Sequence, residues 1–459
     1  MKGKNVFFAA GLFLIMFSLS AVSYALERGK RMPDFGLPAS DGEYYTLSGI
    51  TRISTGAAVF TFFDSKCEPC RKELPLIQKV AKKYAGVNAA FFMVSVGEDR
   101  ETVGKCIKEW GINFPVLFDE TTELAKACDV VTGSLKNIPR TIVVDKYGNV
   151  AEIFKGYHAD MAEELPKAIE MANASPAPPE KTLRIIYTNS ANGVIESCDC
   201  PMNPYGGLVR RLTFFEKILL SDIRVSAGDF FSANDESIKN KFTAVIMEKL
   251  DYDAIVIGDQ EFKTGKDFLM GILQKHSLPI VSANMQVCDG ETCFIIGKPY
   301  VIKEINGIKI GITGVTSESC FVFYPKKIKE RIKFTQTPIE ALKSIVPEMR
   351  KKCGFVFVIA HVNEREIADI EKVPGIDAVF AGHTQGKFFK PGKPVVMQAG
   401  ANGRYVGELV MTVSPDGQVS YRNNFYALTP DIKKDKWGLS QNEEYLLQYK
   451  KSLEELKKN

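Results

Sequence analysis

The sequence carries little excess charge: 59 lysines and arginines face 55 aspartates and glutamates in 459 residues, a net charge of +4. So balanced a composition gives no support for a nucleic-acid partner, which would require a basic surface. The sequence also lacks a Cys-x-x-Cys-His motif, which argues against covalently attached haem. It has a single Cys-x-x-Cys, whereas a zinc ribbon needs two.

After its first 25 residues the sequence has no apolar run long enough to span a bilayer. Residues 1–25 begin with a basic stretch, continue with an apolar core and end in the small-residue pattern Ser23-Tyr24-Ala25. This is the pattern of a secretory signal peptide cut after Ala25. We therefore expect an exported, periplasmic protein, with an uncleaved N-terminal anchor as the alternative. Export would allow its ten cysteines to form disulfides.

One proline-rich stretch, residues 173–182, divides the chain. Its three prolines disfavour both helix and central strand, so we expect a stiff spacer. On both sides, short apolar runs alternate with helical patterns, which predicts α/β domains whose sheets are covered on both faces. In the first domain, strands are predicted at 57–63 and 89–96, and a hairpin of 140–145 with 150–156. The predicted organisation is a first domain at 30–172, a second at 183–430 and a charged tail at 431–459, whose helix is predicted at 441–457.

The motif "CEPC", Cys67 to Cys70, follows a predicted strand at 57–63 and opens an amphipathic helix. A helix N-terminus carries partial positive charge and free N–H groups, and both stabilise a thiolate. Cys67 is therefore predicted to be the exposed nucleophile with a lowered pKa, and Cys70 to resolve a mixed disulfide. A purely structural disulfide is the alternative, which the strand-to-helix position disfavours.

Residues 33–172 resemble the thioredoxin-fold thiol–disulfide oxidoreductases of the TlpA/ResA type. The resemblance rests on "PDFGLPASDGEYYTLSGI", "CEPCRKELP", "FPVLFDETTELAKACDV" and "NIPRTIVVDKYGNV". It implies a thioredoxin fold that needs no cofactor, a cis-proline at Pro139 facing the cysteines, and an active-site acid at Glu73. Glu73 is alternatively a solvated residue of the first helical turn. The sequence departs from this family at Lys66, where Trp is usual, and a cation there should favour the thiolate. Asp64, three residues before Cys67, argues against a peroxiredoxin, in which Thr or Ser is expected at that position.

In the second domain, several apolar runs, among them a strand predicted at 254–258, end in polar tips. Ligands bind at such tips along the carboxyl edge of an α/β sheet. The tips are "YTNSANG", "AGDFF", "IGDQEF", "AHVN" and "AGHTQG". They carry Asp229, Asp259, His361 and His383. Two aspartates and two histidines on separate tips form a metal-type constellation.

The order of these tips resembles the calcineurin-like metallophosphoesterases, particularly the 5′-nucleotidase branch, over about residues 183–428. That branch is a four-layered α/β sandwich with a two-metal site. The resemblance implies that Asp229 bridges both ions. It matches Asp259 to an asparagine ligand of the second ion, and His361 and His383 to imidazole ligands.

The ligands that would serve only the first ion are missing. Ser190 and Asn192 stand where aspartate and histidine are usual, Gln385 replaces a second histidine, and Gln260 replaces the histidine that assists the leaving group. The surviving set suits one divalent transition ion, whereas two-metal hydrolysis needs both ions. We expect weak or no nucleotidase activity. The alternative to one bound ion is an empty cluster of hydrogen-bonded tips.

The remaining cysteines support several interpretations. Cys198 and Cys200 are separated by one residue, which disfavours a bond between them, so they are candidates for a second redox pair or for separate structural disulfides. Their segment "CDCPMNPYGGLVRR" resembles one in exported phosphoesterase-like proteins linked to cytochromes. Cys288 and Cys293 flank an Asp-Gly turn, which predicts a hairpin disulfide. A Cys106–Cys128 bridge is one option among the cysteines whose pairing stays open: Cys106, Cys128, Cys320 and Cys353.

The sequence thus predicts an exported disulfide reductase that acts through its CEPC dithiol, with the phosphoesterase-like domain in a binding or redox role. Its expected partners are a disulfide-bearing client, for example an apocytochrome, and a thiol-electron donor in the membrane. One alternative is a mononuclear phosphoesterase regulated by the first domain. Another makes the second domain a client-binding module for exported cytochromes.

Overall fold

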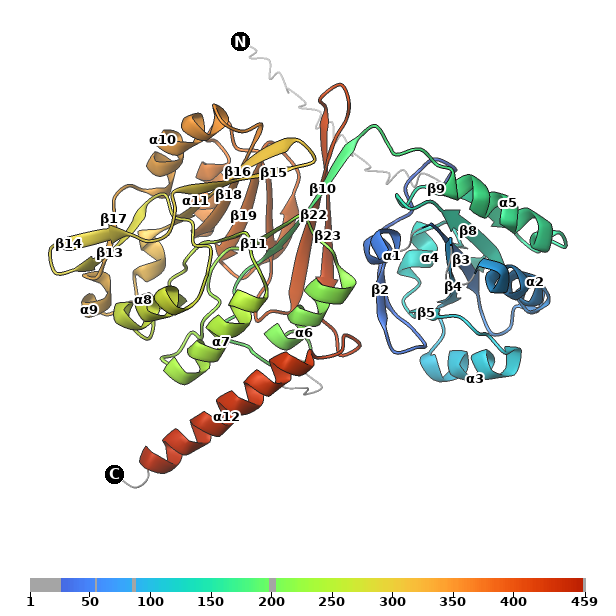
Figure 1. Ribbon diagram of the computed structural model, residues 1–459, viewed down its shortest axis with the longest axis horizontal. Helices are drawn as coiled ribbons and strands as arrows, with labels where there is room; N and C mark the ends of the chain where they lie inside the picture. The colour runs from blue at the N-terminus through green and yellow to red at the C-terminus, as the bar shows by residue number, and fades with distance from the viewer. Residues whose placement is uncertain (1–25, 54–55, 85–87, 198–203, 457–459) are drawn as a thin grey trace, which may run out of the picture.

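The computed structural model describes residues 26–53, 56–84, 88–197 and 204–456. The predicted signal peptide and the cysteines at 198 and 200 lie outside these ranges. Among the described residues, no helix combines the length and the apolar character needed to cross a membrane. Two domains, joined by residues 174–180, lie side by side (Figure 1).

The first domain is built on a five-stranded sheet in the order β5-β4-β3-β8-β9. Its strands are β3 (Ala57–Phe63), β4 (Ala89–Val96), β5 (Val116–Asp119), β8 (Arg140–Val144) and β9 (Val150–Lys155). β3, β4 and β5 run parallel, and β8 and β9 form the predicted antiparallel hairpin. β3 and β4 coincide with the predicted strands, because both are continuous apolar runs.

Side-chain alternation along β3 places a helical layer on each face of this sheet. Phe60 and Phe62 pack with α1 (Leu47–Ile53) and α4 (Glu123–Ala127). Val59 and Phe63 face the opposite core. That core is covered by α2 (Glu68–Tyr84), α3 (Arg100–Trp110) and α5 (Met161–Asn173). Smaller strands are β1 (Gly36–Pro38), β2 (Tyr44–Thr46), β6 (Val131–Thr132) and β7 (Leu135–Lys136).

The second domain contains two large sheets. The first has the order β12-β11-β10-β22-β23, with β10 (Lys181–Thr188), β11 (Ile223–Ser226), β12 (Ala254–Ile255), β22 (Tyr405–Val413) and β23 (Val419–Ala427). The second has the order β15-β16-β18-β19-β21-β20, with β15 (Tyr300–Ile305), β16 (Ile308–Thr316), β18 (Phe355–Val362), β19 (Ala378–His383), β20 (Lys387–Lys390) and β21 (Val395–Ala399). A small sheet, β14-β13-β17, comprises β13 (Met285–Asp289), β14 (Thr292–Ile295) and β17 (Ile332–Phe334).

The two large sheets pack face to face, and helices cover their outer faces. Leu183 and Ile185 of β10 share one core with Ile310 and Ile312 of β16. Ile186 points the other way, toward α6 (Leu208–Thr213), α7 (Ser237–Lys249) and α8 (Lys266–Lys275). Outside the second sheet lie α10 (Pro338–Arg350) and α11 (Glu364–Ile370). This helix–sheet–sheet–helix order is the expected four-layered α/β sandwich.

Three sequence predictions need correction. Residues 254–258, predicted as a strand, form only the two-residue β12, because the chain turns toward a 3₁₀ helix at Gln260–Phe262. The tail helix α12 (Lys436–Leu456) starts five residues before the predicted residue 441. Cys106 and Cys128 are both free thiols. They lie in the cores on opposite faces of the first sheet, so they cannot form a bridge.

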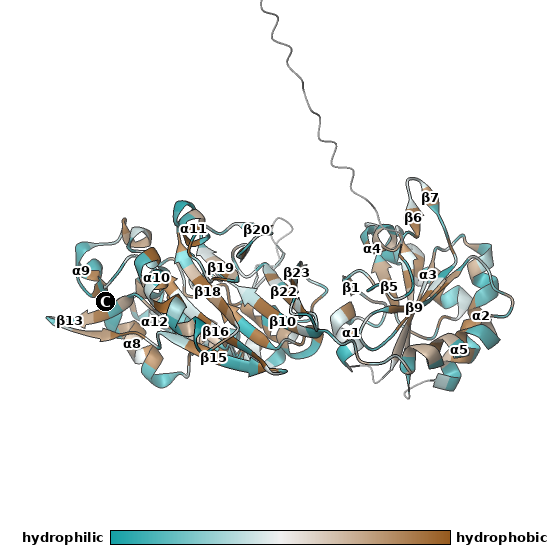
Figure 2. Cartoon of the chain, turned by 90° about the horizontal axis from the view of Figure 1, so that it is seen from above, coloured by the Kyte–Doolittle hydropathy of each residue, from teal (hydrophilic) through white to brown (hydrophobic). Residues whose placement is uncertain are grey.

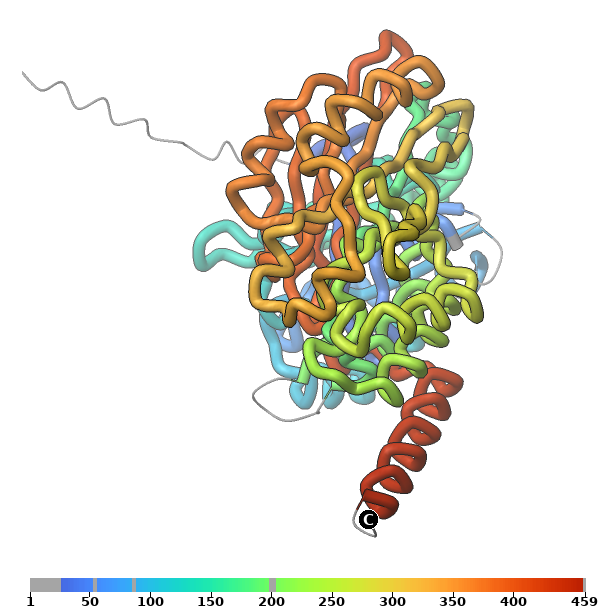
Figure 3. Tube along the Cα trace, turned by 90° about the vertical axis from the view of Figure 1, so that its left-hand side faces the viewer, coloured from blue at the N-terminus to red at the C-terminus, as the bar shows by residue number. Residues whose placement is uncertain are grey.

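Each domain keeps its apolar strands inside, as the brown interior of both lobes shows in Figure 2. The tail helix α12 is different. Its first part packs on α7 and buries Gly438 and Asn442, while its end projects away from the body (Figure 3). Along that end, Leu446, Leu453 and Leu456 are exposed.

Candidate functional site

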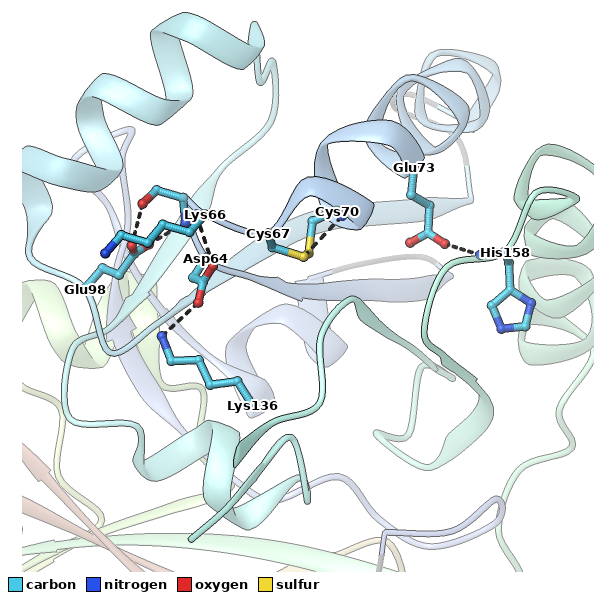
Figure 4. The surroundings of a disulfide bond; sticks show 9 residues. Asp64, Lys66, Cys67, Cys70, Glu73, Glu98, Lys136 and His158 are labelled. Atoms are coloured by element: carbon cyan, nitrogen blue, oxygen red, sulfur yellow. Dashed lines mark hydrogen bonds and ion pairs between the residues drawn. A yellow bond between two sulfur atoms is a disulfide. The ribbon is translucent and has the colours of Figure 1, made fainter. Parts of the chain in front are cut away.

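Cys67 and Cys70 are joined by a disulfide at the point where β3 leads into α2 (Figure 4). The backbone N–H of Cys70 donates a hydrogen bond of 3.2 Å to the Sγ of Cys67. An N–H group in the first helical turn has no partner within the helix, so it is free to stabilise negative charge on this sulfur. The geometry favours Cys67 as the thiolate once the pair is reduced.

Both cysteines of the motif are buried, although Cys67 was predicted to be exposed. Cys67 is 7% exposed and Cys70 is 2% exposed. The prediction that Cys67 is exposed is therefore wrong in degree, because its side chain packs in a core with Phe63, Trp110 and Ile138. Cys67 is still the more accessible of the two sulfur-bearing residues, which suits it to meet a partner disulfide first.

Polar contacts fix the loop that leads into the motif. Asp64 accepts hydrogen bonds from the N–H of Lys66 at 3.1 Å and from the Nζ of Lys136 at 3.0 Å. Glu98 accepts from the N–H and the hydroxyl of Ser65 at 2.8 and 2.6 Å. These contacts lie on one side of the disulfide in Figure 4. They hold the strand-to-helix turn from two neighbouring segments of the chain.

Glu73 lies on the other side of the disulfide, one turn along α2. It is 1% exposed, so its alternative interpretation as a solvated residue is wrong. Its Oε1 accepts from the N–H of His158 at 2.8 Å, and its Oε2 has no hydrogen-bond partner within the described chain. Burial raises the pKa of Glu73, and the His158 N–H offsets this only in part. The peptide bond before Pro139 is cis, as the resemblance implies.

The four predicted metal ligands of the second domain come together. One oxygen of Asp259, Oδ1, lies 3.1 Å from the Nε2 of His361 and 3.0 Å from the Nδ1 of His383. The Oδ1 of Asp229 lies 3.4 Å from the same Nε2 of His361. Tips of β11, β12, β18 and β19 thus meet at one edge of the sandwich, as expected for carboxyl ends of parallel strands.

The buried carboxylates and imidazoles of this cluster strongly affect one another's pKa values. Burial raises the pKa of Asp229 to about 6. Burial opposes the charge on His361, but the neighbouring Asp229 and Asp259 outweigh it and raise its pKa to about 9. Burial also acts against ionisation of Asp259, yet hydrogen bonds from His361 and His383 bring its pKa well below the usual value. The imidazole of His361 lies within 3.4 Å of an oxygen of each carboxylate, and its charge offsets the repulsion between them.

The orientation of His361 suits a metal ligand. Its Nδ1 lies 2.8 Å from the carbonyl oxygen of Ala227, which can only accept a hydrogen bond. The Nδ1 therefore carries the proton, and the Nε2 is directed at the carboxylates. Metal-binding histidines are commonly held in this way through their other ring nitrogen.

The positions that have lost ligands are occupied by hydrogen-bonded amides and hydroxyls. Asn192 donates to the side-chain oxygen of Asn402 at 2.7 Å, and Ser190 accepts from Asn189 at 3.2 Å. Gln385 is exposed. The residues at the first-ion position hold neighbouring loops together, and their donor atoms do not fit a metal ion.

The structure adds two residues that the sequence prediction did not include. The Sγ of Cys320 lies within 4.8 Å of ligand-type atoms of Asp259, His361 and His383. Tyr324 donates its hydroxyl to the Oδ2 of Asp259 at 2.9 Å. Both follow the tip of β16 in the stretch "TSESCFVFY", which was not recognised as a further tip because it carries no aspartate or histidine. The donors of the cluster fit one divalent ion.

Among the other cysteines, Cys288 and Cys293 form the predicted disulfide across the β13–β14 hairpin, where they are directly paired. Within the described chain, Cys320 and Cys353 are free and buried.

The two domains of the chain are similar to different known proteins. Residues 28–153 match the AhpC/TSA family. The thiol–disulfide oxidoreductase ResA of Geobacillus kaustophilus is 31% identical over 133 residues, which cover 29% of this chain and 71% of that protein. The first domain belongs to the ResA family. Its sheet, its disulfide at the start of α2 and its cis-proline are therefore those of a thioredoxin-fold oxidoreductase domain.

Downstream of this ResA-like domain, the chain resembles 5′-nucleotidases. A 5′-nucleotidase of Diplobatis ommata is 27% identical over 293 residues, 55% of this chain and 50% of the relative. The crystal structure of a 5′-nucleotidase precursor from Thermus thermophilus aligns with a TM-score of 0.51 at 22% identity, covering 59% of each chain. The chain thus spans about half the length of the curated 5′-nucleotidase that it matches. It fuses a ResA-like domain to a 5′-nucleotidase-like α/β sandwich.

Proposed function

We propose that the protein is an exported thiol–disulfide oxidoreductase that reduces disulfides of a client protein through Cys67 and Cys70. The observation that carries this proposal is the hydrogen bond from the N–H of Cys70 to the Sγ of Cys67 at the start of α2. It favours one sulfur as the thiolate, which is the attacking form. Membership of the ResA family supports the same chemistry.

The reaction balances within one dithiol cycle. The Cys67 thiolate attacks one sulfur of the client disulfide, whose S–S bond breaks, and the other client sulfur leaves and takes up a proton. Cys70 then loses its proton and attacks the Sγ of Cys67, so the mixed disulfide breaks and the second client sulfur leaves. The client gains two electrons and two protons, and the Cys67–Cys70 disulfide forms again. A dithiol donor at the membrane would return the electrons and protons.

Glu73 and Pro139 take supporting roles in this proposal. The raised pKa of Glu73 lets this buried carboxyl hold a proton that an exposed glutamate would release, so it can act as a proton donor during exchange. Pro139 directly precedes β8, which pairs with the strand that leads to Cys67, so it lies at the edge that a client peptide would meet. Residues 1–25 carry the signal-peptide pattern that supports export.

The decisive test is mixed-disulfide trapping in cells with Cys70→Ser. We expect a covalent adduct through Cys67 that reductant releases, and its mass names the client. Cys67→Ala should abolish reduction of insulin disulfides, while Cys106→Ser, a buried thiol of the same core, should retain it. Full insulin reduction by Cys67→Ala would contradict the proposal.

A second function concerns the sandwich domain, which we propose binds one divalent ion without ordinary nucleotidase activity. The convergence of Asp259, His361 and His383, with Asp229 beside them, supports it. When bound, an ion there would supply Lewis acidity and fix the tips. The amide of Gln260 cannot protonate a leaving group as a histidine would. A mononuclear phosphoesterase remains the alternative that the test must address.

Metal analysis and turnover separate these outcomes. We expect about one ion per chain in protein purified without chelator, and no metal-dependent hydrolysis of nucleotides or bis(p-nitrophenyl) phosphate. Gln260→His should not restore hydrolysis, because the first-ion ligands are still missing. Less than roughly a tenth of an ion per chain would refute metal binding. Metal-dependent turnover by the unmodified protein would establish the mononuclear phosphoesterase instead.

A further inference from the structure

Cys320 belongs to the cluster of the sandwich domain, although its residue type has no counterpart in the predicted ligand set. One ligand-type atom from each of Asp259, Cys320, His361 and His383 lies within 4.8 Å of all the others. Cys320 sits in the 3₁₀ turn Glu318–Phe321, directly after β16. Because β16 pairs with β18, this turn brings the thiol beside the strand that carries His361.

We propose that Cys320 binds the single ion of the sandwich domain as a thiolate, together with Asp259, His361 and His383, and that Asp229 is not a ligand. The inference rests on the proposed binding of one divalent ion. It specifies which side chains bind that ion and which class of metal they select.

Asp229 is already engaged by the residue that replaces a catalytic histidine. The backbone N–H of Gln260 donates to its Oδ1 at 3.2 Å, and the Nε2 of Gln260 donates to its Oδ2 at 3.2 Å. Asp259 differs, since its Oδ2 accepts from the hydroxyl of Tyr324 while its Oδ1 faces the two imidazoles. The Oδ1 of Asp259 can therefore exchange its contacts with the imidazoles for a cation, whereas both oxygens of Asp229 accept hydrogen bonds from Gln260.

The thiol of Cys320 can supply the second negative charge that the ion requires, and the cluster of mutually close ligand atoms includes Cys320 but not Asp229. Cys320 is 6% exposed and makes one long contact, 3.6 Å from its Sγ to the carbonyl oxygen of His361. A buried divalent ion is tolerated when its ligands cancel its charge. One carboxylate from Asp259 and one thiolate from Cys320 cancel two positive charges, and the neutral imidazoles complete four ligands.

This ligand set defines the class of metal and the class of site. Thiolate and imidazole favour Zn²⁺ or Co²⁺, whereas Mn²⁺ and Mg²⁺ favour oxygen ligands. Four protein ligands also fill a tetrahedral zinc site and leave no open position for a substrate. The site therefore stabilises the tips of the sandwich, in accordance with the loss of the first-ion ligands.

Cobalt spectroscopy on the full-length protein tests the proposal without relying on activity. The protein is stripped of metal, the Cys67–Cys70 disulfide is kept oxidised, and Co²⁺ alone is added. We expect one Co²⁺ per chain with sulfur-to-cobalt charge-transfer absorption in the near ultraviolet. Cys320→Ser should lose this absorption. The matched control Cys353→Ser, which removes a buried thiol hydrogen-bonded to the carbonyl of Met349, should keep it, as should Asp229→Asn.

Each result of the cobalt experiment supports or overturns one part of the proposal. One Co²⁺ per chain without charge-transfer absorption, or absorption that persists in Cys320→Ser, overturns the thiolate ligand and leaves the bound ion in place. Loss of the absorption in Asp229→Asn overturns the exclusion of Asp229. No bound Co²⁺ overturns the proposed metal binding itself. If Cys320→Ser fails to fold, X-ray absorption of the unmodified zinc-loaded protein decides: one sulfur at about 2.3 Å supports the proposal, and nitrogen and oxygen alone overturn it.

Discussion

At the scale of single residues, an unusual backbone conformation marks the tips of the sandwich domain. Five tip residues have φ between 45° and 72°, a left-handed region that is uncommon for residues other than glycine. They are Ser190, Asn192, Asp229, His383 and Gln385. Two are predicted ligands, and three stand where the family has ligands that are missing here. Such strain usually marks a functional site, which is consistent with a binding role for these tips.

Gly258 tests how tightly these tips are packed. A Cβ at this position would lie 2.4 Å from the Oδ1 of Asp229 and 2.6 Å from the Cε1 of His361. We expect Gly258→Ala to push these side chains apart and destabilise the sandwich domain by about 1–3 kcal/mol. Thermal unfolding measures the effect. Gly271→Ala is the control, since its Cβ on α8 would meet nothing within 4 Å; equal melting temperatures for both variants would contradict the prediction.

Glu73 gives the first domain a pH dependence. Because its pKa is raised in the folded state, the folded protein keeps a proton that the unfolded chain has released, so stability declines as pH rises above the ordinary value of 4.5. Glu73→Gln cannot lose a proton. We expect the free energy of unfolding of the variant, relative to the unmodified protein, to increase as pH rises through the raised pKa.

Denaturant unfolding of the oxidised protein at a series of pH values measures this difference. Glu101→Gln is the control, because Glu101 is an exposed partner of Lys105 on α3. A difference between Glu73→Gln and the unmodified protein that stays constant with pH would show that Glu73 titrates at its ordinary value.

At the scale of elements, the β13–β14 hairpin depends on its disulfide more than on its core. Phe294 and Ile295 are 56% and 62% exposed, so β14 buries little apolar surface. Cys288 and Cys293 are paired directly across the two strands, and their bond closes a short loop. Closing such a loop limits the unfolded chain and thereby stabilises the folded one.

Replacing both cysteines by serine should reduce the stability of the sandwich domain by about 2 kcal/mol, the entropy of closing a loop of this length. Protease cleavage within the hairpin should become faster as well, because the hairpin opens more easily. Thr292→Ala, an exposed change in the same hairpin, should leave both measurements unchanged. A double serine variant as stable and as resistant as the unmodified protein would mean that backbone pairing alone holds the hairpin.

At the scale of the whole molecule, the two domains touch beyond their linker. The hydroxyl of Thr46 donates to the carbonyl of Ile218 at 3.0 Å. Ion pairs cross the same boundary, among them Arg422 with Asp34 at 2.8 Å and Arg100 with Asp431, whose Nη2–Oδ2 distance is 3.2 Å. These contacts hold the ResA-like domain in one orientation against the sandwich.

The variant Arg100→Ala/Arg422→Ala tests this orientation. Both arginines are partly exposed, so each ion pair contributes no more than about 1 kcal/mol. We expect a larger radius of gyration by small-angle scattering and faster proteolysis of residues 174–180, most clearly at low salt where the pairs are strongest. Lys105→Ala, which breaks an ion pair within one helix, is the control. Scattering curves identical to those of the unmodified protein would show that these two ion pairs do not set the orientation.

The sequence by itself determined the two α/β domains, their boundary and the disulfide motif, because these depend on local information. The apolar runs that became β3 and β4, the prolines of the spacer and the position of Cys67 before a helix are all read along the chain. The tips that carry Asp229, Asp259, His361 and His383 were equally visible, since each follows an apolar run.

Only the tertiary structure decided which of these groups meet and how deeply they are buried. Cys67 and Glu73 proved buried, because helices from distant parts of the chain cover them. Cys106 and Cys128 were separated by the sheet between them. Cys320 entered the cluster through the pairing of β16 with β18, which no local pattern encodes. Chemistry that depends on contacts between strands is set by sheet order, and sheet order exists only in the folded chain.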